Sequence, residues 1–283
     1  MNPVQKALWY VESHSREPLT LESIAAGCYV SPFHLTRAFA GTFGWPLMRY
    51  VRARRLSEAA RQLAHGASDI LALALDAGYG SHEAFTRAFR ELFALTPEQV
   101  RAQGHLNNLS LVEAITMNPT ATPALAPPRF ETLEPTLFAG LVERYPCQAP
   151  VGIPNQWQRF QPYLGQMAKQ ADPAAYGVCY NFDEEGNFDY LSGVAVKDAA
   201  GLPTGFQTLQ TTRQKYVVFR HPGHVAGIRA TFAAIWSDWF PNSGYQAAPA
   251  PTLERYGPEF DGQTGLGGLE IWIAIEGEAA PQT

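Results

Sequence analysis

Cysteine and long apolar runs are both scarce in this sequence. Its 283 residues include 3 cysteines, Cys28, Cys147 and Cys179, whose spacing fits neither a disulfide framework nor a CxxC metal clamp, so we expect small buried groups. No apolar stretch approaches the roughly 20 residues that cross a bilayer, and the start lacks a basic segment followed by an apolar one. We therefore expect a cytoplasmic chain that does not enter the membrane.

Signatures of metal, phosphate and nucleophile chemistry are missing as well. There is no GxSxG elbow and no glycine-rich phosphate loop. His221 and His224 stand in HPGH, where Pro-Gly predicts a tight turn rather than a metal pair. The run DEEG at 183–186 lacks the alternation of a calcium loop. We expect neither a catalytic residue nor a metal or cofactor.

Charge and composition divide the chain into parts. Residues 1–105 carry 11 Lys and Arg against 9 Asp and Glu, and the rest carries 10 against 17. The length is enough for two domains. The stretch MNPTATPALAPP at 117–128 has no helical or strand period and is typical of a linker. The predicted parts are a first domain over 1–108, a linker over 109–128, a second domain over 129–277 and a tail over 278–283.

The first domain contains an internal duplication. A shift of fifty residues aligns Tyr29 with Tyr79, Ser31 with Ser81, Thr36 with Thr86, Arg37 with Arg87, Phe39 with Phe89 and Phe43 with Phe93. In each copy an apolar-periodic helix runs to a glycine, Gly27 or Gly78, which should end it, and a serine then caps the next helix. Helix, short turn and helix is the arrangement that presents a second helix to the DNA major groove.

The second helix of each copy has an apolar side and an outward side at 100° per residue. The predicted outward residues are Phe33, Thr36, Arg37 and Ala40 in the first copy and Glu83, Thr86, Arg87 and Arg90 in the second. Arginine can bond guanine O6 and N7 together, glutamate can accept from cytosine N4, and phenylalanine or threonine can pack on a thymine methyl. The pair Thr-Arg occurs at the same position of both helices. This repetition favours contact with DNA bases over the alternative that these residues only face solvent.

A single long helix is predicted between the two copies, from Pro46 to His65. About twenty residues span roughly 30 Å, close to the roughly 34 Å between successive major grooves, so a rigid connection would place both recognition helices in adjacent grooves. Arg49, Arg52, Arg54 and Arg55 cluster near its start. Some of them could contact phosphates and others could pair with acids such as Glu58; the sequence does not sort them.

The first hundred or so residues resemble the DNA-binding domain of the AraC/XylS family of bacterial regulators. The resemblance lies in LESIAAGCYVSPFHLTRAFAGTFG, in YVRARRLSEAARQL and in ALDAGYGSHEAFTRAFRELFALTPEQVR. It implies an all-α domain with two helix-turn-helix units. The DNA-contacting residues expected from motif and resemblance are Ser31, Phe33, Thr36, Arg37, His82, Glu83, Thr86, Arg87 and Arg90.

The second domain mixes strands with helices. Strands are predicted at 137–144, 176–182, 188–196, 215–221 and 269–275, and helices at 155–171 and 225–240. Strand, helix and strands recur twice, which favours an α+β domain with pseudo-two-fold symmetry. In the last strand, alternation puts Glu270 and Trp272 on one face. A cleft there would suit a flat, lipophilic cation; the alternative is that Glu270 points into solvent.

Residues 129 to 277 resemble the GyrI-like small-molecule-binding domain of multidrug-responsive regulators. The matching segments are NQWQRF, YLSGVAV, KYVVFRHPGH, PTLERYGPEF and LEIWIAI. In that family a glutamate of the last strand commonly lies at the base of the ligand cleft, which implies Glu270 here, with Glu254 as the other acid. Trp157, Tyr190, Tyr216 and Trp272 are the aromatic candidates for the walls of the cleft.

The leading hypothesis is a ligand-responsive transcription regulator that binds double-stranded operator DNA, a hydrophobic small molecule and RNA polymerase, and that is not an enzyme. One alternative is a GyrI-like hydrolase that uses Glu270 with Trp157. Another is a constitutive DNA-binding protein whose effector domain is degenerate. The effector, the operator, the sign of regulation and the oligomeric state stay open, since one chain can fill two grooves.

Overall fold

The computed structural model describes residues 3–15, 17–115, 124–147, 150–167, 169–183 and 185–276, which fall into two compact units. The first unit holds residues 5–29 and 47–115, and the second holds 3–4, 30–46 and 124–276. Two predicted segments lie partly or wholly outside the described residues. These are the middle of the predicted linker, at 116–123, and the whole predicted tail, at 278–283. Each unit is therefore described by itself.

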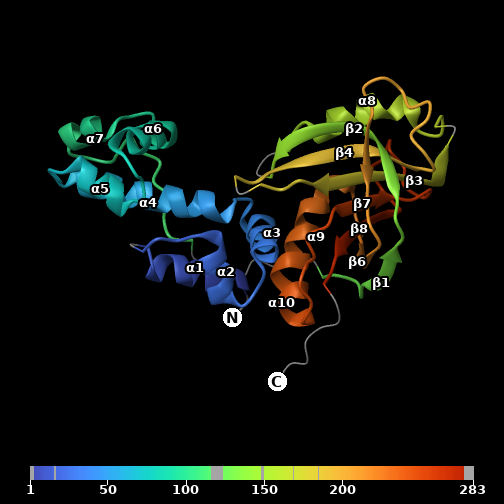
Figure 1. The fold of residues 1–283 in the computed structure, drawn as a ribbon, viewed down its shortest axis with the longest axis horizontal. Coiled ribbons are helices and arrows are strands. Elements are labelled where there is room, and N and C mark those ends of the chain that lie inside the picture. Colours follow the sequence, from blue (N-terminus) through green and yellow to red (C-terminus); the bar gives the residue numbers. More distant parts are fainter. Residues whose placement is uncertain are drawn as a thin grey trace. The chain divides into compact units, whose positions relative to one another are not determined.

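The first unit is helical (Figure 1). Its helices are α1 (Pro3–Ser13), α2 (Leu21–Cys28), α4 (Leu47–Ala64), α5 (Ile70–Asp76), α6 (His82–Phe93) and α7 (Pro97–Gln103). Helix α4 confirms the predicted long helix. Helices α4 to α7 bury one apolar cluster that includes Leu63, Phe85, Phe89 and Phe93, so the second helix-turn-helix unit, α5 and α6, has its own core.

The helix ends follow the predicted capping, with one exception. Ser81 accepts a hydrogen bond from the Ala84 N–H at 3.2 Å and caps α6, and Gly78 follows α5 with φ 87°. The prediction that Gly27 ends its helix was wrong, because α2 continues to Cys28 and its cap, Tyr29, takes the left-handed conformation at φ 60°. A Cβ at Gly27 would lie 2.6 Å from the Tyr10 ring. Glycine is needed there for close packing, not for a turn.

The second unit is built on one curled antiparallel sheet (Figure 1). Its strands are β1 (Arg129–Leu133), β2 (Leu137–Pro146), β3 (Gln170–Tyr180), β4 (Asn187–Val196), β5 (Gln207–Gln210), β6 (Gln214–Arg220), β7 (Thr252–Tyr256) and β8 (Leu269–Ala274). The spatial order is β1-β6-β8-β7-β3-β4-β2-β5. Its helical segments are α3 (Pro32–Phe43), α8 (Ile153–Phe160), η1 (Gln161–Tyr163), η2 (Val225–Gly227), α9 (Ile228–Ala234), the π-helix η3 (Ile235–Trp239) and α10 (Phe240–Ser243).

The strand order confirms the predicted pseudo-two-fold symmetry. From the centre outward, β3, β4 and β2 on one side correspond to β7, β8 and β6 on the other. The edge strands are exchanged between the halves, since β1 pairs with β6 and β5 pairs with β2. The symmetry axis passes between β3 and β7, where Gly177 pairs with Glu254.

Pairing register assigns every strand residue to one of two faces, because residues directly opposite share a face. Gly177, Glu254 and Ile271 are linked by the register and lie on what we call the helix face. Helix α8 packs against β2 and β4 on this face, and Trp239 of η3 packs against Phe219 of β6. The opposite face, called the far face, buries an apolar cluster: Phe138, Tyr176, Val178, Leu191, Tyr216, Val218 and Leu253, with Trp272 packed against it.

The predicted helix over 155–171 was too long. Helix α8 ends at Phe160, a short 3-10 turn follows, and Gln170 already begins β3. Gly165 adopts φ 71° between the two elements, a conformation that stops a helix. Three short strands, β1, β5 and β7, were not predicted as strands, since 4 or 5 residues are too few for a visible period.

Candidate functional site

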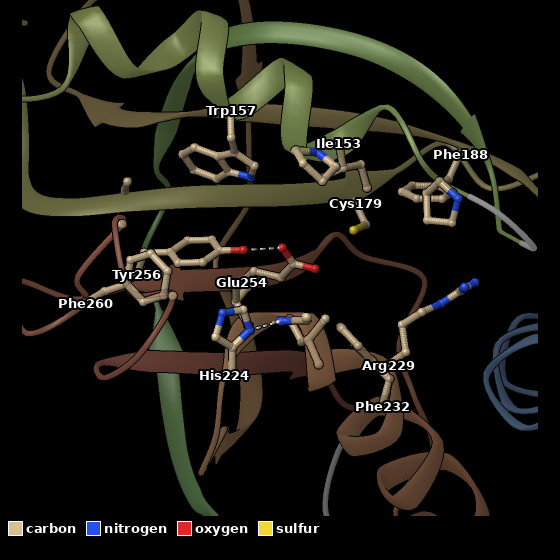
Figure 2. A pocket seen from close by; sticks show the side chains of 18 of the residues that line it. Ile153, Trp157, Cys179, Phe188, His224, Arg229, Phe232, Glu254, Tyr256 and Phe260 are labelled. Atoms are coloured by element: carbon tan, nitrogen blue, oxygen red, sulfur yellow. Dashed lines mark hydrogen bonds between the residues drawn. The ribbon is translucent and has the colours of Figure 1, made fainter.

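A deep cleft of about 1730 Å³ opens on the helix face of the second unit. Its floor is the centre of the sheet, where β3 meets β7, and its walls come from α8 on one side and from η2 and α9 on the other (Figure 2). The cleft therefore lies on the pseudo-symmetry axis, between the two helical layers. Its aromatic and sulfur-bearing lining residues include Trp157, Cys179, Phe182, Phe188, Phe232, Trp236, Tyr256 and Phe260.

Glu254 of β7 places a carboxylate at the floor of this cleft. The residue is 8% exposed. Its Oε2 accepts hydrogen bonds from the Tyr190 hydroxyl at 2.7 Å and the Tyr256 hydroxyl at 2.9 Å. Trp157 Nε1 donates in turn to the Tyr190 hydroxyl at 2.9 Å. The four side chains form a connected network from α8 to β7, and we call it the Glu254 network.

Burial controls the protonation of the Glu254 network. It raises the pKa of Glu254 above its ordinary value, while the hydrogen bonds from Tyr190 and Tyr256 lower that pKa in part. It also raises the pKa of both tyrosines well above their ordinary values, so both phenols stay protonated donors. Within the described ranges no Lys, Arg or His forms an ion pair with Glu254. A cation in the cleft would supply the charge partner that this acid lacks.

The backbone at Gly177 makes room for the network. A Cβ at this position would lie 2.0 Å from the Tyr190 hydroxyl and 2.7 Å from Glu254 Oε2. No side chain larger than hydrogen fits without displacing one of them. Gly177 was not singled out from the sequence, and neither was Tyr256. Alternation along Thr252–Tyr256 puts Tyr256 on the same face as Glu254, a signal that could have located it.

The structure divides the six predicted ligand residues between two faces. Trp157, Tyr190 and Glu254 belong to the Glu254 network. The other three do not reach the cleft, because Glu270, Trp272 and Tyr216 lie on the far face. Their register partners show this: Glu270 is opposite Arg255, and Tyr216 is opposite Ala274. The placement of these three residues in a ligand cleft is therefore corrected.

Glu270 has a structural role instead. It forms ion pairs with Arg129 at 2.9 Å and Arg255 at 3.5 Å, and it accepts a hydrogen bond from Trp272 Nε1 at 3.1 Å. Partial burial raises the pKa of Glu270, but the hydrogen bonds from Arg129 and Trp272 together with the charges of Arg129 and Arg255 hold that pKa below its ordinary value. The predicted hydrolytic pair is not formed, because Trp157 covers the helix face while Glu270 lies on the far face.

Helix α3 also borders the cleft. Ser31 caps it by accepting from the His34 N–H at 3.1 Å, and Pro32 occupies its first turn, as predicted. Its predicted outward side is not open: Arg37 lies in the cleft, with its guanidinium 3.8 Å from the centre of the Phe182 ring. Phe33 and Thr36 are half-buried, and the Thr36 hydroxyl bonds the Pro32 carbonyl at 2.9 Å.

The outward side of α6 matches the prediction except at Thr86, which is half-buried and whose hydroxyl oxygen is enclosed. Glu83, Arg87 and Arg90 are exposed, and together with His82 and Thr86 they line a shallow groove along the helix. His82 Nε2 lies 3.0 Å from Glu98 Oε1 of α7. The opposite side buries Phe85, Phe89 and Phe93. This surface offers a carboxylate and two guanidinium groups along one helix, the groups that read base edges.

The arginines of α4 are sorted by their contacts. Arg54 binds both oxygens of Glu12, at 3.0 and 2.8 Å, and the Val112 carbonyl at 3.0 Å, so it stabilises the unit. Arg55 donates to the Ser15 carbonyl at 3.1 Å. Arg49 and Arg52 are exposed.

His221 and His224, for which the sequence predicts a tight turn rather than a metal pair, make contacts within the second unit. His221 contacts Thr231 Oγ1 at 2.8 Å and the His224 carbonyl at 2.9 Å. Within the part of the chain that the structure describes, no cluster of three or more His, Cys, Asp or Glu is arranged to hold a metal. The helices of the same residues include none with the length and apolarity to span a bilayer.

Two family models match the chain. Residues 126–276 match the GyrI-like small molecule binding domain, and residues 24–103 match a helix-turn-helix domain. The first match covers the whole unit that carries the Glu254 network apart from α3. The second covers both predicted recognition helices, α3 and α6.

Known proteins are similar to the chain over most of its length or over one part of it. Right origin-binding protein of Escherichia coli K12 is 27% identical over 271 residues, which cover 93% of this chain and 92% of that protein. Multiple antibiotic resistance protein MarA of Salmonella typhimurium is 32% identical over 98 residues, 35% of this chain and 77% of that protein. The solved structure of SAV2435 bound to tetraphenylphosphonium is 22% identical with a TM-score of 0.45, covering 54% of this chain and 95% of that one.

Proposed function

We propose that this chain, which belongs to the family of GyrI-like small molecule binding domains and carries an AraC-type helix-turn-helix region, regulates transcription in response to a lipophilic cation bound at Glu254. DNA binding and small-molecule binding follow from the family. The chemical class of the ligand and the residues that hold it are the proposal. The observation that carries it is a buried carboxylate, bonded only by phenols among the described residues, on the floor of an aromatic cleft.

The chemistry of the cleft favours binding over catalysis. Aromatic rings attract a cation through their faces, and the Glu254 carboxylate adds a direct charge partner. Cys179 lies beside Glu254, but burial raises the pKa of its thiol well above the ordinary value, so the thiol is a poor nucleophile. We therefore propose that the chain acts as a sensor and not as an enzyme.

DNA recognition is proposed to use the outward residues of both recognition helices. On α6 these are His82, Glu83, Thr86, Arg87 and Arg90, which line one groove. On α3 they are Ser31, Phe33, Thr36 and Arg37. We also propose contact with RNA polymerase, for which the half-exposed Leu71 and Leu75 of α5 offer an apolar surface in the same unit as α6.

The test of the ligand site compares two carboxylates. Tetraphenylphosphonium carries one delocalised positive charge on aromatic rings, and its binding is measured by calorimetry. Glu254→Gln removes the charge and keeps an acceptor for the two phenols; we expect a roughly 10- to 100-fold loss of affinity, in line with about 1.4 kcal/mol for each factor of ten. The matched control, Glu270→Gln on the far face, should bind as the wild type does. Equal losses in both variants would contradict the site.

A further inference from the structure

The predicted DNA-reading side of α3 is turned toward the cleft. The Arg37 guanidinium stacks 3.8 Å from the centre of the Phe182 ring and lies 5.7 Å from that of Trp236. Its Nη2 is 3.5 Å from Thr252 Oγ1 of β7. A guanidinium enclosed in this way cannot reach a base edge at the same time. The position of Arg37 is therefore incompatible with its predicted contact with DNA.

Further contacts hold α3 against the rest of the second unit. The His34 ring is buried, its Nδ1 accepts from the Ala247 N–H at 3.2 Å, and the ring packs in a T-shaped arrangement with that of Trp236. At the start of the helix, the Ser31 N–H donates to the Gln246 side chain at 3.1 Å. These contacts extend from the cap of the helix to Arg37, over its first half, and each joins a named pair of groups, so the packing is specific.

Gly41 allows α3 to pack closely against Trp236. A Cβ at Gly41 would lie 2.5 Å from Trp236 Cδ1 and 3.0 Å from its Cγ, and Trp236 is itself 1% exposed. Glycine weakens a helix relative to alanine. A residue of low helix propensity thus stands in α3 at a position where a methyl group would collide with Trp236.

Arg37 and the proposed ligand have charges of the same sign in one cleft. Arg37 has no carboxylate partner among the described residues, and its Nε is buried without a hydrogen bond there. Its contact Thr252 shares a strand face with Glu254, two residues along β7. A cation at Glu254 would therefore bring a second positive charge into the same cleft and repel the Arg37 guanidinium.

We propose that α3 is masked by its packing in the cleft and that a cation at Glu254 displaces Arg37 and releases the helix for DNA. The regulation in this proposal rests on the proposed function of the Glu254 site. Reciprocity follows: release of α3 by DNA must raise the affinity of the cleft for the cation by the same factor.

Amide hydrogen exchange tests the packing without any ligand. The Ala247 amide is bonded to His34 of α3, so its exchange rate reports whether the helix is in place. Gly41→Ala strengthens the helix and clashes with Trp236. We expect exchange at Ala247 to rise about tenfold or more in Gly41→Ala. The control is Gly262→Ala, where a Cβ meets nothing within 4 Å. Unchanged exchange in Gly41→Ala would refute the masking.

DNA affinity tests the consequence, with a duplex selected by the wild-type chain from a random-sequence pool. Gly41→Ala should bind it about fivefold tighter or more. Phe182→Ala removes the ring under Arg37 and leaves α3 itself unchanged, so a gain in this variant cannot come from a new DNA contact. If exchange rises while neither variant gains affinity, masking is contradicted. Failure of tetraphenylphosphonium to bind would refute the proposed ligand instead, because the Gly41→Ala experiments use none.

Discussion

Glu254 is an acid whose surroundings favour two opposite states. Burial disfavours its charged form, whereas the Tyr190 and Tyr256 hydroxyls stabilise that form, and the net effect is a raised pKa. Removing two charges from water is costly unless they pair closely. A lipophilic cation is weakly hydrated for its size, so its removal from water costs less free energy than that of a small cation. It is therefore the kind of cation that this buried carboxylate can bind most favourably.

Cation binding should depend on pH through Glu254. The ionised carboxylate adds its attraction to that of the aromatic rings and the protonated acid does not, so affinity is full above the raised pKa of Glu254 and falls toward that of Glu254→Gln as the pH decreases through that pKa. The fall should begin above the ordinary value of 4.5. Below the pKa, each pH unit lowers affinity about tenfold. Calorimetric titrations of tetraphenylphosphonium between pH 8 and pH 5 measure this. The Glu254→Gln variant should show no such slope, and a flat wild-type profile would argue against the site.

His34 makes the position of α3 sensitive to acid. Burial alone lowers its pKa from 6.5 to about 4, so the packed helix resists protonation and the released helix accepts a proton more readily. The packing is complete above pH 6.5 and weakens as the pH falls from 6.5 toward 4. At pH 5 the loss is roughly 2 kcal/mol, from about 1.4 kcal/mol for each pH unit.

The measurement is exchange at the Ala247 amide from pH 7.5 to pH 5, corrected for the intrinsic dependence of exchange on pH. Protection should decrease toward pH 5 in the wild type. His34→Gln keeps a side-chain acceptor and cannot be protonated in this range, so its corrected profile should be level. An identical slope in both proteins would assign the effect to another group.

At the scale of elements, the sequence identified the helices better than the site. Duplicated spacing located α3 and α6, and apolar period located α4, because these helices carry their amphipathic pattern over 12 or 18 residues. Strand β8 was also found, with the correct two faces. Alternation separates two faces, yet it does not tell which one the helices cover. That is why Glu270 was placed in the cleft and Glu254, on the short strand β7, was ranked second.

Helix α6 supports a direct prediction on DNA binding. Arg87 is exposed on a side whose reverse is anchored by Phe85 and Phe89, so its truncation should not disturb the fold. Arg87→Ala should weaken binding to the selected duplex by about 1–3 kcal/mol, measured by fluorescence anisotropy at a fixed salt concentration. Arg213→Ala, an exposed charge of the second unit, is the control. Equal affinities of Arg87→Ala and the control would remove α6 from the interface.

At the scale of the whole molecule, regulation requires that ligand and DNA favour the same state of the chain. The second unit contains both the Glu254 network and the helix α3, which belongs by sequence to the region that matches a helix-turn-helix domain. One cleft is thus lined by both Arg37 and Glu254, the residue to which we propose that the cation binds. The amino-acid composition could not reveal that Arg37 lies in this cleft, because its position depends on the packing of residues 30–46 against residues more than a hundred positions away.

The affinity of the wild-type chain for its selected duplex, with and without saturating tetraphenylphosphonium, tests this account most directly. We predict that the cation tightens DNA binding by about fivefold or more in the wild type and has no effect in Glu254→Gln, in keeping with a coupling of at least about 1 kcal/mol. Equal affinity with and without the bound cation, or tightening that persists in Glu254→Gln, would contradict it.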